Sequence, residues 1–243
     1  MADERLLDIQ GVSKRFGGFH ALTEVSVHVN AGERFGLIGP NGSGKTTLIN
    51  CVSGALPCDG GRVVFGGKDI TAAPGYKRAR MGLVRSFQIP KPFTSMTVLE
   101  NLCIPLEYAA HYKSHHGIHI QKEAEEILRL VGLDGKAGEK PGGLTQIEMR
   151  KLELARALAA EPKLLILDEA MAGLSSSEVD EIIEMLIDLN ERGITIIMIE
   201  HIMRAVMSFS ERIAVLDAGK KIAEGSPEEV VANPEVERAY LGE

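Results

Sequence analysis

The N-terminal part of the chain alternates apolar and polar residues, whereas later segments repeat apolar residues at helical spacing. Glu24 to Val29 alternates strictly, which predicts a half-buried strand of an antiparallel sheet. The apolar run Phe35 to Ile38 predicts a buried strand, and a helix is expected to follow it and to end near Ser53. Arg62 to Phe65 lies between two glycine pairs and predicts another strand. Residues 1 to 85 are therefore expected to combine a small β layer with an α/β core.

The segment from Met96 to Leu158 has the pattern of amphipathic helices. One apolar stripe ends at Gly132, where a helix C-cap is expected, and another ends before Pro162, which stops a helix. The two stripes consist of Ala124, Ile127, Leu128 and Val131, and of Met149, Leu152, Ala155 and Leu158.

Strand and helix patterns alternate again after Pro162. Leu164 to Leu167 is a fully apolar run, and Ile194 to Ile199 predicts another buried strand. A helix that ends at Gly193 is expected between them. Strand, helix and strand in this order predict a parallel sheet. Ser226 to Glu229 and Asn233-Pro234 are helix starts, so the tail is expected to be folded. The apolar stripe of the helix that is expected to end at Gly193 consists of Val179, Ile182, Ile183, Leu186 and Leu189.

The composition fits one compact domain of 243 residues, with 44% hydrophobic and 25% charged residues. The formal net charge of -7 and the absence of a long basic run argue against a nucleic-acid partner. Met1 to Glu4 is acidic, and no apolar run approaches the roughly 20 residues of a membrane span, so a cytosolic location is expected. Cys51, Cys58 and Cys103 form no CxxC pair, and no disulfide is expected.

The stretch that follows Ile38 fits the pattern GxxxxGK[ST] of a phosphate-binding loop. In such a loop, backbone N–H groups and the start of a helix, here at Lys45 or Thr46, face the phosphates. Lys45 is expected to reach the β- and γ-phosphates, and the Thr46 hydroxyl to bind Mg²⁺. A chance glycine-rich turn is the alternative, and it leaves the Lys-Thr pair between strand and helix unexplained. The expected nucleotide-binding residues are Gly39, Pro40, Asn41, Gly42, Ser43, Gly44, Lys45, Thr46 and Thr47.

Two carboxylates, Asp168 and Glu169, follow the apolar run Leu164 to Leu167, at the strand end where α/β sheets place their ligands. Asp168 is expected to hold the Mg²⁺ ion, and Glu169 to act as the general base that polarises a water for attack on the γ-phosphate. An acidic helix cap is the alternative. The phosphate loop upstream favours the metal and base roles.

The order of the motifs resembles the ATPase subunit of ATP-binding cassette (ABC) transporters over nearly the whole chain. The resemblance is carried by the phosphate loop, Phe87-Gln88, Glu153 to Leu158, Asp168-Glu169 and Glu200-His201. Four further stretches are similar to the branched-chain amino acid importer ATPases of this family: Phe16 to Leu22, Arg85 to Gln88, Ala172 to Leu174 and Ala239 to Glu243.

This resemblance implies a single ABC ATPase domain of the α/β class, with a P-loop NTPase core, a parallel sheet, a small antiparallel β layer and a helical subdomain. Residues 1–88 and 161–243 match the core and tail, and residues 89–160 match the helical subdomain. The implied function is a Mg²⁺- and ATP-dependent motor subunit of an importer. Its implied partners are a second ATPase subunit, membrane permease subunits and, indirectly, a solute-binding protein, at the inner face of the cell membrane.

Three other functions remain open from the sequence. A lipid or lipopolysaccharide exporter ATPase resembles the same subfamily, and a module that binds nucleotide but hardly hydrolyses it is also possible. A soluble cassette ATPase of DNA repair or translation usually carries tandem cassettes or a long coiled-coil insertion, and this sequence has neither.

The resemblance also assigns individual residues. Phe16 matches the aromatic residue that stacks on adenine, although an aromatic side chain here could also belong to a core. Gln88 matches the glutamine that reaches Mg²⁺ and the attacking water. His201 matches the histidine that contacts the γ-phosphate, although a single histidine is more often an ordinary surface or core residue. Gly173 to Ser175 matches the loop that crosses the dimer interface.

One segment departs from the family pattern. Leu144 to Glu148 stands where the family reads LSGGQ, the signature that binds the γ-phosphate held by the opposite subunit. Thr145 keeps the hydroxyl group and is expected to contact ATP, but Gln146 and Ile147 put side chains where glycine allows close approach. Glu148 adds a negative charge. The ATP site that this segment completes in the opposite subunit is therefore expected to be less efficient.

Four histidines lie close together at His111, His115, His116 and His119. The spacing could suit a metal ion, but Gly117 interrupts the helix, and no cysteine or carboxylate joins the run. A solvated, variable stretch is expected instead.

Overall fold

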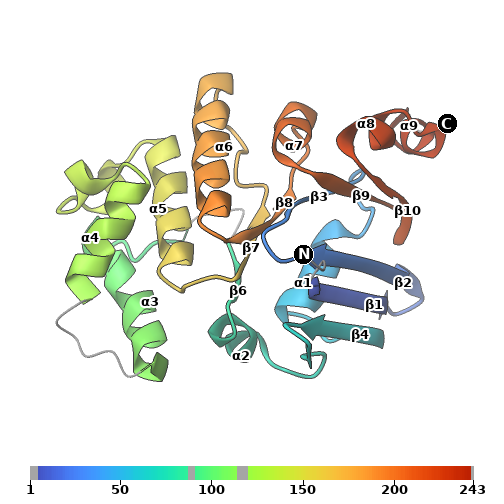
Figure 1. Cartoon of the computed structure of the whole chain (residues 1–243), viewed down its shortest axis with the longest axis horizontal. Helices are drawn as coiled ribbons and strands as arrows, with labels where there is room; N and C mark the ends of the chain where they lie inside the picture. Colours follow the sequence, from blue (N-terminus) through green and yellow to red (C-terminus); the bar gives the residue numbers. More distant parts are fainter. Residues whose placement is uncertain (1–4, 87–90, 114–119, 242–243) are drawn as a thin grey trace.

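The computed structural model describes residues 5–86, 91–113 and 120–241. Two β-sheets lie side by side, with helices at both sides of the larger one (Figure 1). The larger sheet has the order β10-β9-β3-β8-β7-β6, and the smaller one has the order β2-β1-β4-β5. The strands are β1 (Arg5–Phe16), β2 (Phe19–Asn30), β3 (Arg34–Ile38), β4 (Gly60–Phe65), β5 (Lys68–Asp69), β6 (Leu83–Arg85), β7 (Leu164–Asp168), β8 (Thr195–Ile199), β9 (Arg212–Asp217) and β10 (Lys220–Gly225).

The helices cover the sheets and extend to one side of them (Figure 1). Helices α3, α4 and α5 lie together at the left of the view, far from the small sheet. Helices α8 and α9 lie at the upper right, at the C-terminus of the chain. The α-helices are α1 (Lys45–Ser53), α2 (Gly75–Arg80), α3 (Val98–Lys113), α4 (Ile120–Leu130), α5 (Gln146–Leu158), α6 (Ser176–Glu191), α7 (Met203–Phe209), α8 (Pro227–Val231) and α9 (Pro234–Leu241). None of the helices in the described ranges combines the length and apolar character needed to span a bilayer.

The small sheet is antiparallel, as the alternating N-terminal pattern predicts. In β2, Val25, Val27 and Val29 are buried, while Glu24 and Ser26 are exposed. The buried face packs with α1 and with one face of the larger sheet in a shared apolar cluster. This packing holds α1, the helix that follows the phosphate loop, between the two sheets.

The larger sheet confirms the predicted parallel arrangement. Strand β3 pairs in parallel with β8 and β9, and β7 pairs in parallel with β8 and β6. Only the edge strand β10 among the described residues joins this sheet in the antiparallel sense. Because parallel strands end at the same edge, the segments after β3, β6, β7 and β8 come together there.

The predicted helices of the middle segment are present. Ala124, Leu128 and Val131 are buried around α4, and Ile127 packs against the same cluster. The stripe of α5 enters this cluster too, with Leu152, Ala155 and Leu158 buried and Met149 partly so. The division into a core and a helical subdomain at residues 89 and 160 stays a prediction.

Some elements were not predicted from the pattern: β1, β5, β6, α2, α7, β9 and β10. Of the histidine cluster, His115, His116 and His119 lie outside the described residues. The part of the chain that the structure describes contains no cluster of three or more His, Cys, Asp or Glu side chains suited to hold a metal ion.

Candidate nucleotide-binding site

The carboxyl ends of four neighbouring parallel strands bring most of the predicted site together. The phosphate loop follows β3, Glu200-His201 follows β8, and Asp168-Glu169 ends and follows β7. The loop and the two carboxylates therefore lie on either side of β8 at one edge of the sheet, and the charges of Glu169 and Asp168 act to raise the pKa of the Lys45 amine. A fourth group, Arg85 at the end of β6, reaches the same edge.

The backbone of the phosphate loop is folded too tightly for side chains at two of its glycines. A Cβ atom on Gly39 would lie 2.1 Å from the carbonyl oxygen of Leu216, and one on Gly44 would lie 2.7 Å from that of Ala21. Both residues also have positive φ angles, 149° and 103°. Space is open around Gly42, where no atom comes within 4 Å of the Cβ position. The loop is therefore packed on its inner side and open on its outer side.

Uncompensated hydrogen-bond donors make the loop suitable for an anion. Helix α1 begins at Lys45 with no side-chain cap and no acidic residue in its first turn, so its N–H groups keep their partial positive charge. The hydroxyl oxygen of Ser43 is buried and has no hydrogen-bond partner among the described residues. Such a buried polar group calls for a ligand or water. A bound phosphate would satisfy both features.

The side chain of Lys45 folds back onto the phosphate loop. Its Nζ atom donates hydrogen bonds to the carbonyl oxygens of Gly39, at 2.7 Å, and Pro40, at 3.1 Å. Burial lowers the pKa of this amine, and the charges of Glu169 and Asp168 oppose that effect. Thr46, the next residue of α1, is exposed. A lysine amine and a threonine hydroxyl are thus held at the open mouth of the loop.

The two carboxylates after the apolar run have different surroundings. Asp168 is the last residue of β7 and only 5% exposed, and one of its oxygens accepts a hydrogen bond from Arg85. Glu169 has a φ angle of 49°, and its N–H group donates to the carbonyl oxygen of Ile199 at 2.9 Å. A non-glycine residue in this region is strained, and such strain gathers at functional sites. Asp168 is thus still part of the strand, while Glu169 is the first residue of the left-handed turn that follows it.

His201 and its neighbour differ sharply in exposure. The side chain of His201 is 62% exposed, so it does not belong to a core. Glu200 is 2% exposed; its Oε1 atom accepts a hydrogen bond from the N–H group of Met171, and its Oε2 atom lies 4.0 Å from Nδ1 of His201. Burial raises the pKa of Glu200. Glu200 is thus a buried carboxyl group directly behind the exposed histidine.

Phe16 lies near the loop on the hairpin of β1 and β2. Its ring is 48% exposed, with Nζ of Lys14 at 5.7 Å from the ring centroid, so the alternative of a core aromatic is wrong. The same hairpin approaches the loop at Ala21, next to Gly44. Stacking on adenine stays a prediction. Gln88 lies outside the described residues.

The segment that departs from the family signature begins helix α5. Thr145 is the N-cap, and its N–H group donates to the carboxylate of Glu148, while its hydroxyl accepts from the N–H group of Glu148. The side chain of Gln146 turns away from this helix start and donates to the carbonyl oxygen of Ala172 at 3.3 Å. Arg150 donates to the same oxygen. The start of α5 is therefore tied to the loop that follows Glu169 in the same chain.

Sequence reasoning assigned no role to three site residues, which are Arg85, Glu200 and Asn50 of α1, whose Oδ1 atom accepts a hydrogen bond from Nη1 of Arg85. Arg85 and Glu200 were noted only as parts of longer stretches that carry the resemblance. A charged residue at the end of an otherwise apolar strand, next to a motif, is the signal that could have singled out Arg85. Asn50, inside a helix, carries no such signal.

Comparisons with known proteins agree with this geometry. A family model described as "ABC transporter" matches residues 22–172, and one described as "Branched-chain amino acid ATP-binding cassette transporter" matches residues 220–243. A probable branched-chain amino acid transport ATP-binding protein, LivG, of Archaeoglobus fulgidus is 39% identical, with 98% of this chain and 96% of that protein covered.

Solved structures are similar as well. A crystal structure of the ADP conformation of an ATP-binding cassette of an ABC transporter has a TM-score of 0.89 and 36% identity, covering 98% of this chain and 99% of the other. A dimeric cassette in a post-hydrolysis state, bound to ADP and Pi, has a TM-score of 0.81 and 26% identity, covering 91% and 98%.

Proposed function

Because the chain belongs to the ABC transporter family, we propose that it is the ATP-hydrolysing subunit of an importer for branched-chain or related amino acids. The observation that carries the proposal is that the phosphate loop with Lys45 and the pair Asp168-Glu169 lie at the carboxyl ends of β3 and β7, on either side of β8 in one parallel sheet. The relative named above and the second family model, on residues 220–243, support the substrate class. They do not favour an exporter or a soluble cassette ATPase.

The phosphate loop binds the nucleotide in this proposal. The N–H groups at the start of α1 and the Ser43 hydroxyl donate hydrogen bonds to the phosphate oxygens. Lys45 exchanges its two carbonyl acceptors, Gly39 and Pro40, for the β- and γ-phosphates. The exposed ring of Phe16 provides a face for adenine. Asn41, Gly42 and Thr47 complete the loop. The bound nucleotide that is named for one similar structure, ADP, supports this assignment.

The oxygen atoms at the mouth of the phosphate loop suit Mg²⁺ as ligands. Mg²⁺ prefers oxygen ligands and usually binds one or two protein groups together with phosphates. Here Thr46 offers an exposed hydroxyl and Asp168 a carboxylate with one oxygen left after its bond to Arg85. When bound, the ion would neutralise charge that develops on the phosphates. Gln88 is assigned to the same ion by the family resemblance alone.

Glu169 and His201 act on the γ-phosphate. Glu169, the first residue after β7, takes the proton of the attacking water as a general base. His201 is exposed at the end of the neighbouring strand and can contact the γ-phosphate. The products are ADP and inorganic phosphate, which one similar dimeric cassette holds.

Two protein partners belong to the proposal. A second ATPase subunit, identical or similar, would pair head to tail with this chain, so that Thr145 and Gly173 to Ser175 face the opposite nucleotide. Membrane permease subunits would hold the pair at the inner face of the cell membrane. A dimeric cassette among the similar structures supports the first partner.

A groove between α2, α3 and the end of α5 suits the permease. It has a volume of about 710 Å³ and opens between the small sheet and the helical segment. Arg80 lies over the rings of Tyr76 and Tyr108, at 5.1 and 5.8 Å, and Arg156 lies over Phe93. All three rings are exposed. Arginine and exposed aromatic residues are typical of residues that dominate protein interfaces. We propose that a short cytoplasmic segment of the permease with apolar and acidic side chains occupies this groove.

The test is uptake by the assembled transporter. The chain, its permease and its partner ATPase would be purified together, reconstituted in vesicles and supplied with the solute-binding protein, ATP and radiolabelled leucine. ATP-dependent uptake of leucine, and none of a lipid or sugar, is expected. A complex without uptake of any branched-chain amino acid would contradict the substrate class, and failure to recover a permease would contradict the transport role.

Variants separate the groove from the nucleotide site. Tyr76→Ser with Tyr108→Ser removes the two rings beside Arg80, so we expect loss of the permease on purification with ATP binding unchanged. The matched control is Val231→Ser, which removes an exposed apolar side chain of α8 outside the groove. Retention of the permease by the double variant would contradict the assignment of the groove.

A further inference from the structure

Arg85 joins the phosphate-loop helix to the strand that carries Asp168. Its Nη1 atom donates to Oδ1 of Asn50 in α1 at 2.6 Å, and its Nη2 atom donates to Oδ2 of Asp168 at 2.5 Å. Arg85 itself ends β6, which pairs with β7, and Ser86, the next residue, donates its N–H to Ile166 of β7. Three separate segments of the chain therefore meet at one guanidinium group.

The ion pair lies largely out of solvent. The side chain of Arg85 is 12% exposed and that of Asp168 is 8% exposed. Removing one member of such a pair leaves a buried charge without its partner. A guanidinium group can also donate from two nitrogens in fixed directions, whereas a lysine amine is a single point of charge. The two bonds of Arg85 use this property, because each nitrogen serves a different partner.

We propose that Arg85 is a positioning residue that fixes Asp168 for Mg²⁺. The inference rests on the proposed role of Asp168 as a metal ligand. The bond to Arg85 occupies Oδ2 and leaves Oδ1 for the ion, and the bond to Asn50 sets the distance between this carboxylate and the phosphate loop.

Two effects of the positive charge oppose each other. The guanidinium group holds the carboxylate in place, but its charge also repels a divalent cation. The phosphates of ATP bind the same ion and supply most of the electrostatic attraction. The main task of Asp168 is then to hold its carboxylate in the right place. Partners of metal ligands that act by orientation typically contribute 10- to 100-fold to metal affinity. Orientation is therefore expected to exceed repulsion.

The experiment compares nucleotide binding with and without the metal. A fluorescent ATP analogue is titrated into the full-length chain in Mg²⁺ and in EDTA, and Mg²⁺ is then titrated at fixed nucleotide. For Arg85→Gln we expect the Mg²⁺ concentration at half-saturation to rise on the order of 10-fold or more, with affinity in EDTA unchanged. Arg85→Lys keeps the positive charge but cannot make both hydrogen bonds, so its Mg²⁺ concentration at half-saturation is expected to lie between those of wild type and Arg85→Gln. Asn50→Ala, which keeps the ion pair, is expected to cause a smaller rise.

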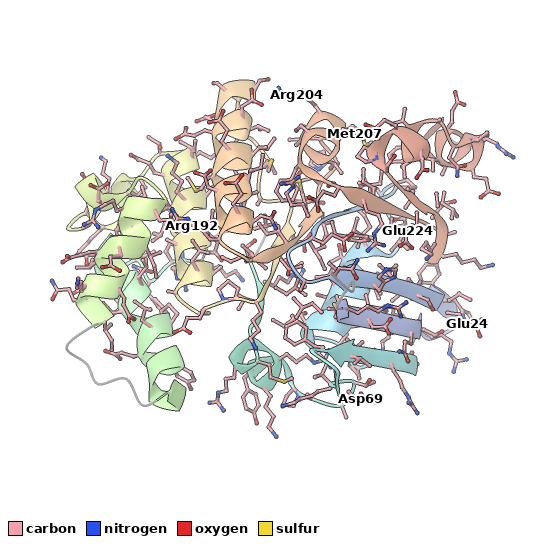
Figure 2. The ribbon with its side chains drawn as sticks, viewed as in Figure 1. Glu24, Asp69, Arg192, Arg204, Met207 and Glu224 are labelled. Atoms are coloured by element: carbon pink, nitrogen blue, oxygen red, sulfur yellow. The ribbon has the colours of Figure 1, made fainter. Side chains whose placement is uncertain are left out.

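Arg204→Gln is the matched control. Arg204 on α7 forms an ion pair with Asp180 of α6, and both side chains are exposed. Arg204 is labelled at the top of Figure 2. No change in the response to Mg²⁺ is expected from it. If Arg85→Gln fails to fold, judged by circular dichroism, Arg85→Lys and Asn50→Ala carry the test.

The outcomes separate this inference from the proposed function. If the wild-type chain binds no ATP, or binds it equally with and without Mg²⁺, the proposed function fails. If the wild type responds to Mg²⁺ and Arg85→Gln responds at the same or a lower concentration, orientation by Arg85 is wrong. An equal loss of affinity in Mg²⁺ and in EDTA would show a merely structural ion pair, and would also overturn the inference.

Discussion

Glu200 brings a carboxyl group into the core beside the proposed nucleotide site. One of its oxygens has a backbone partner, Met171, and the other has no hydrogen-bond partner among the described residues. Burial raises its pKa; the hydrogen bond from Met171 and the charge of His201 act in the opposite direction, and the charge of Glu169 adds to the rise. The ionised form is therefore less stable in the folded chain than in the unfolded chain.

This raised pKa predicts a pH-dependent cost to stability. Between the ordinary pKa of a glutamate, about 4.3, and the raised value, the folded chain binds a proton that the unfolded chain releases. The free energy of unfolding then falls as pH rises, by up to about 1.4 kcal/mol per pH unit for this one group. Glu200→Gln removes the titration and can keep the oxygen that accepts from Met171. Relative to wild type, the variant should gain stability from pH 5 to pH 8, measured by urea unfolding.

Glu191→Gln controls for a change of charge at an exposed position. Its stability relative to wild type should stay nearly constant over the same range. A constant difference for Glu200→Gln as well would show that Glu200 titrates normally.

The start of helix α5 is the element in which this chain departs most from its family. The capping bonds between Thr145 and Glu148 stabilise the helix start, and the hydrogen bond from the N–H group of Thr145 lowers the pKa of Glu148. A carboxylate is thereby kept ionised where the family signature faces a phosphate. Gln146 meanwhile holds the loop at Ala172 and lies 2.4 Å from the position that a Cβ atom of Gly173 would take.

A triple variant tests whether these side chains weaken the site. Gln146→Gly with Ile147→Gly and Glu148→Gln removes two side chains and one negative charge near a polyanion. Glutamine keeps the capping bond, although each glycine costs roughly 1 kcal/mol of helix stability relative to alanine. We expect ATP-driven dimerisation and ATP turnover to rise, on the order of 10-fold if about 1.4 kcal/mol is recovered. Analytical ultracentrifugation and phosphate release measure the two quantities, with and without the partner ATPase.

Gln121→Gly with Lys122→Gly is the matched control, since it places two glycines in the exposed first turn of α4. This control should change neither dimerisation nor turnover. Equal or lower values for the triple variant, with folding intact, would show that Leu144 to Glu148 already forms a competent signature.

At the scale of the whole molecule, the elements that have a local sequence pattern could be predicted. The contacts that depend on the order of strands in the sheet could not. The runs before Asp168 and after Gly193 are long and apolar, so their parallel strands could be predicted. Strand β6 has three residues, too few for a periodic signal, and it exists because β7 pairs with it from about 80 positions away. The contact between Arg85 and Asp168 follows from that pairing, so no local pattern could predict it.

The same distinction applies to the site. Lys45, Asp168 and Glu169 could be predicted because the phosphate loop and the strand end are local motifs. The self-capped start of α5 and the groove of Tyr76 and Tyr108 depend on how distant elements pack, and the sequence gives no direct sign of them. Conversely, residues 87–90, which include Gln88, are assigned by the sequence alone.

The central claim is that Glu169 activates water for hydrolysis of ATP bound by Lys45, and the most direct measurement is ATP binding and phosphate release by Glu169→Gln. Glutamine suits the same turn and cannot take a proton, so ATP affinity should be unchanged while turnover falls on the order of 10² to 10⁴. Lys45→Ala should instead lose ATP affinity, because it removes a cation from the phosphates. Unchanged turnover by Glu169→Gln, or tight ATP binding by Lys45→Ala, would contradict the account.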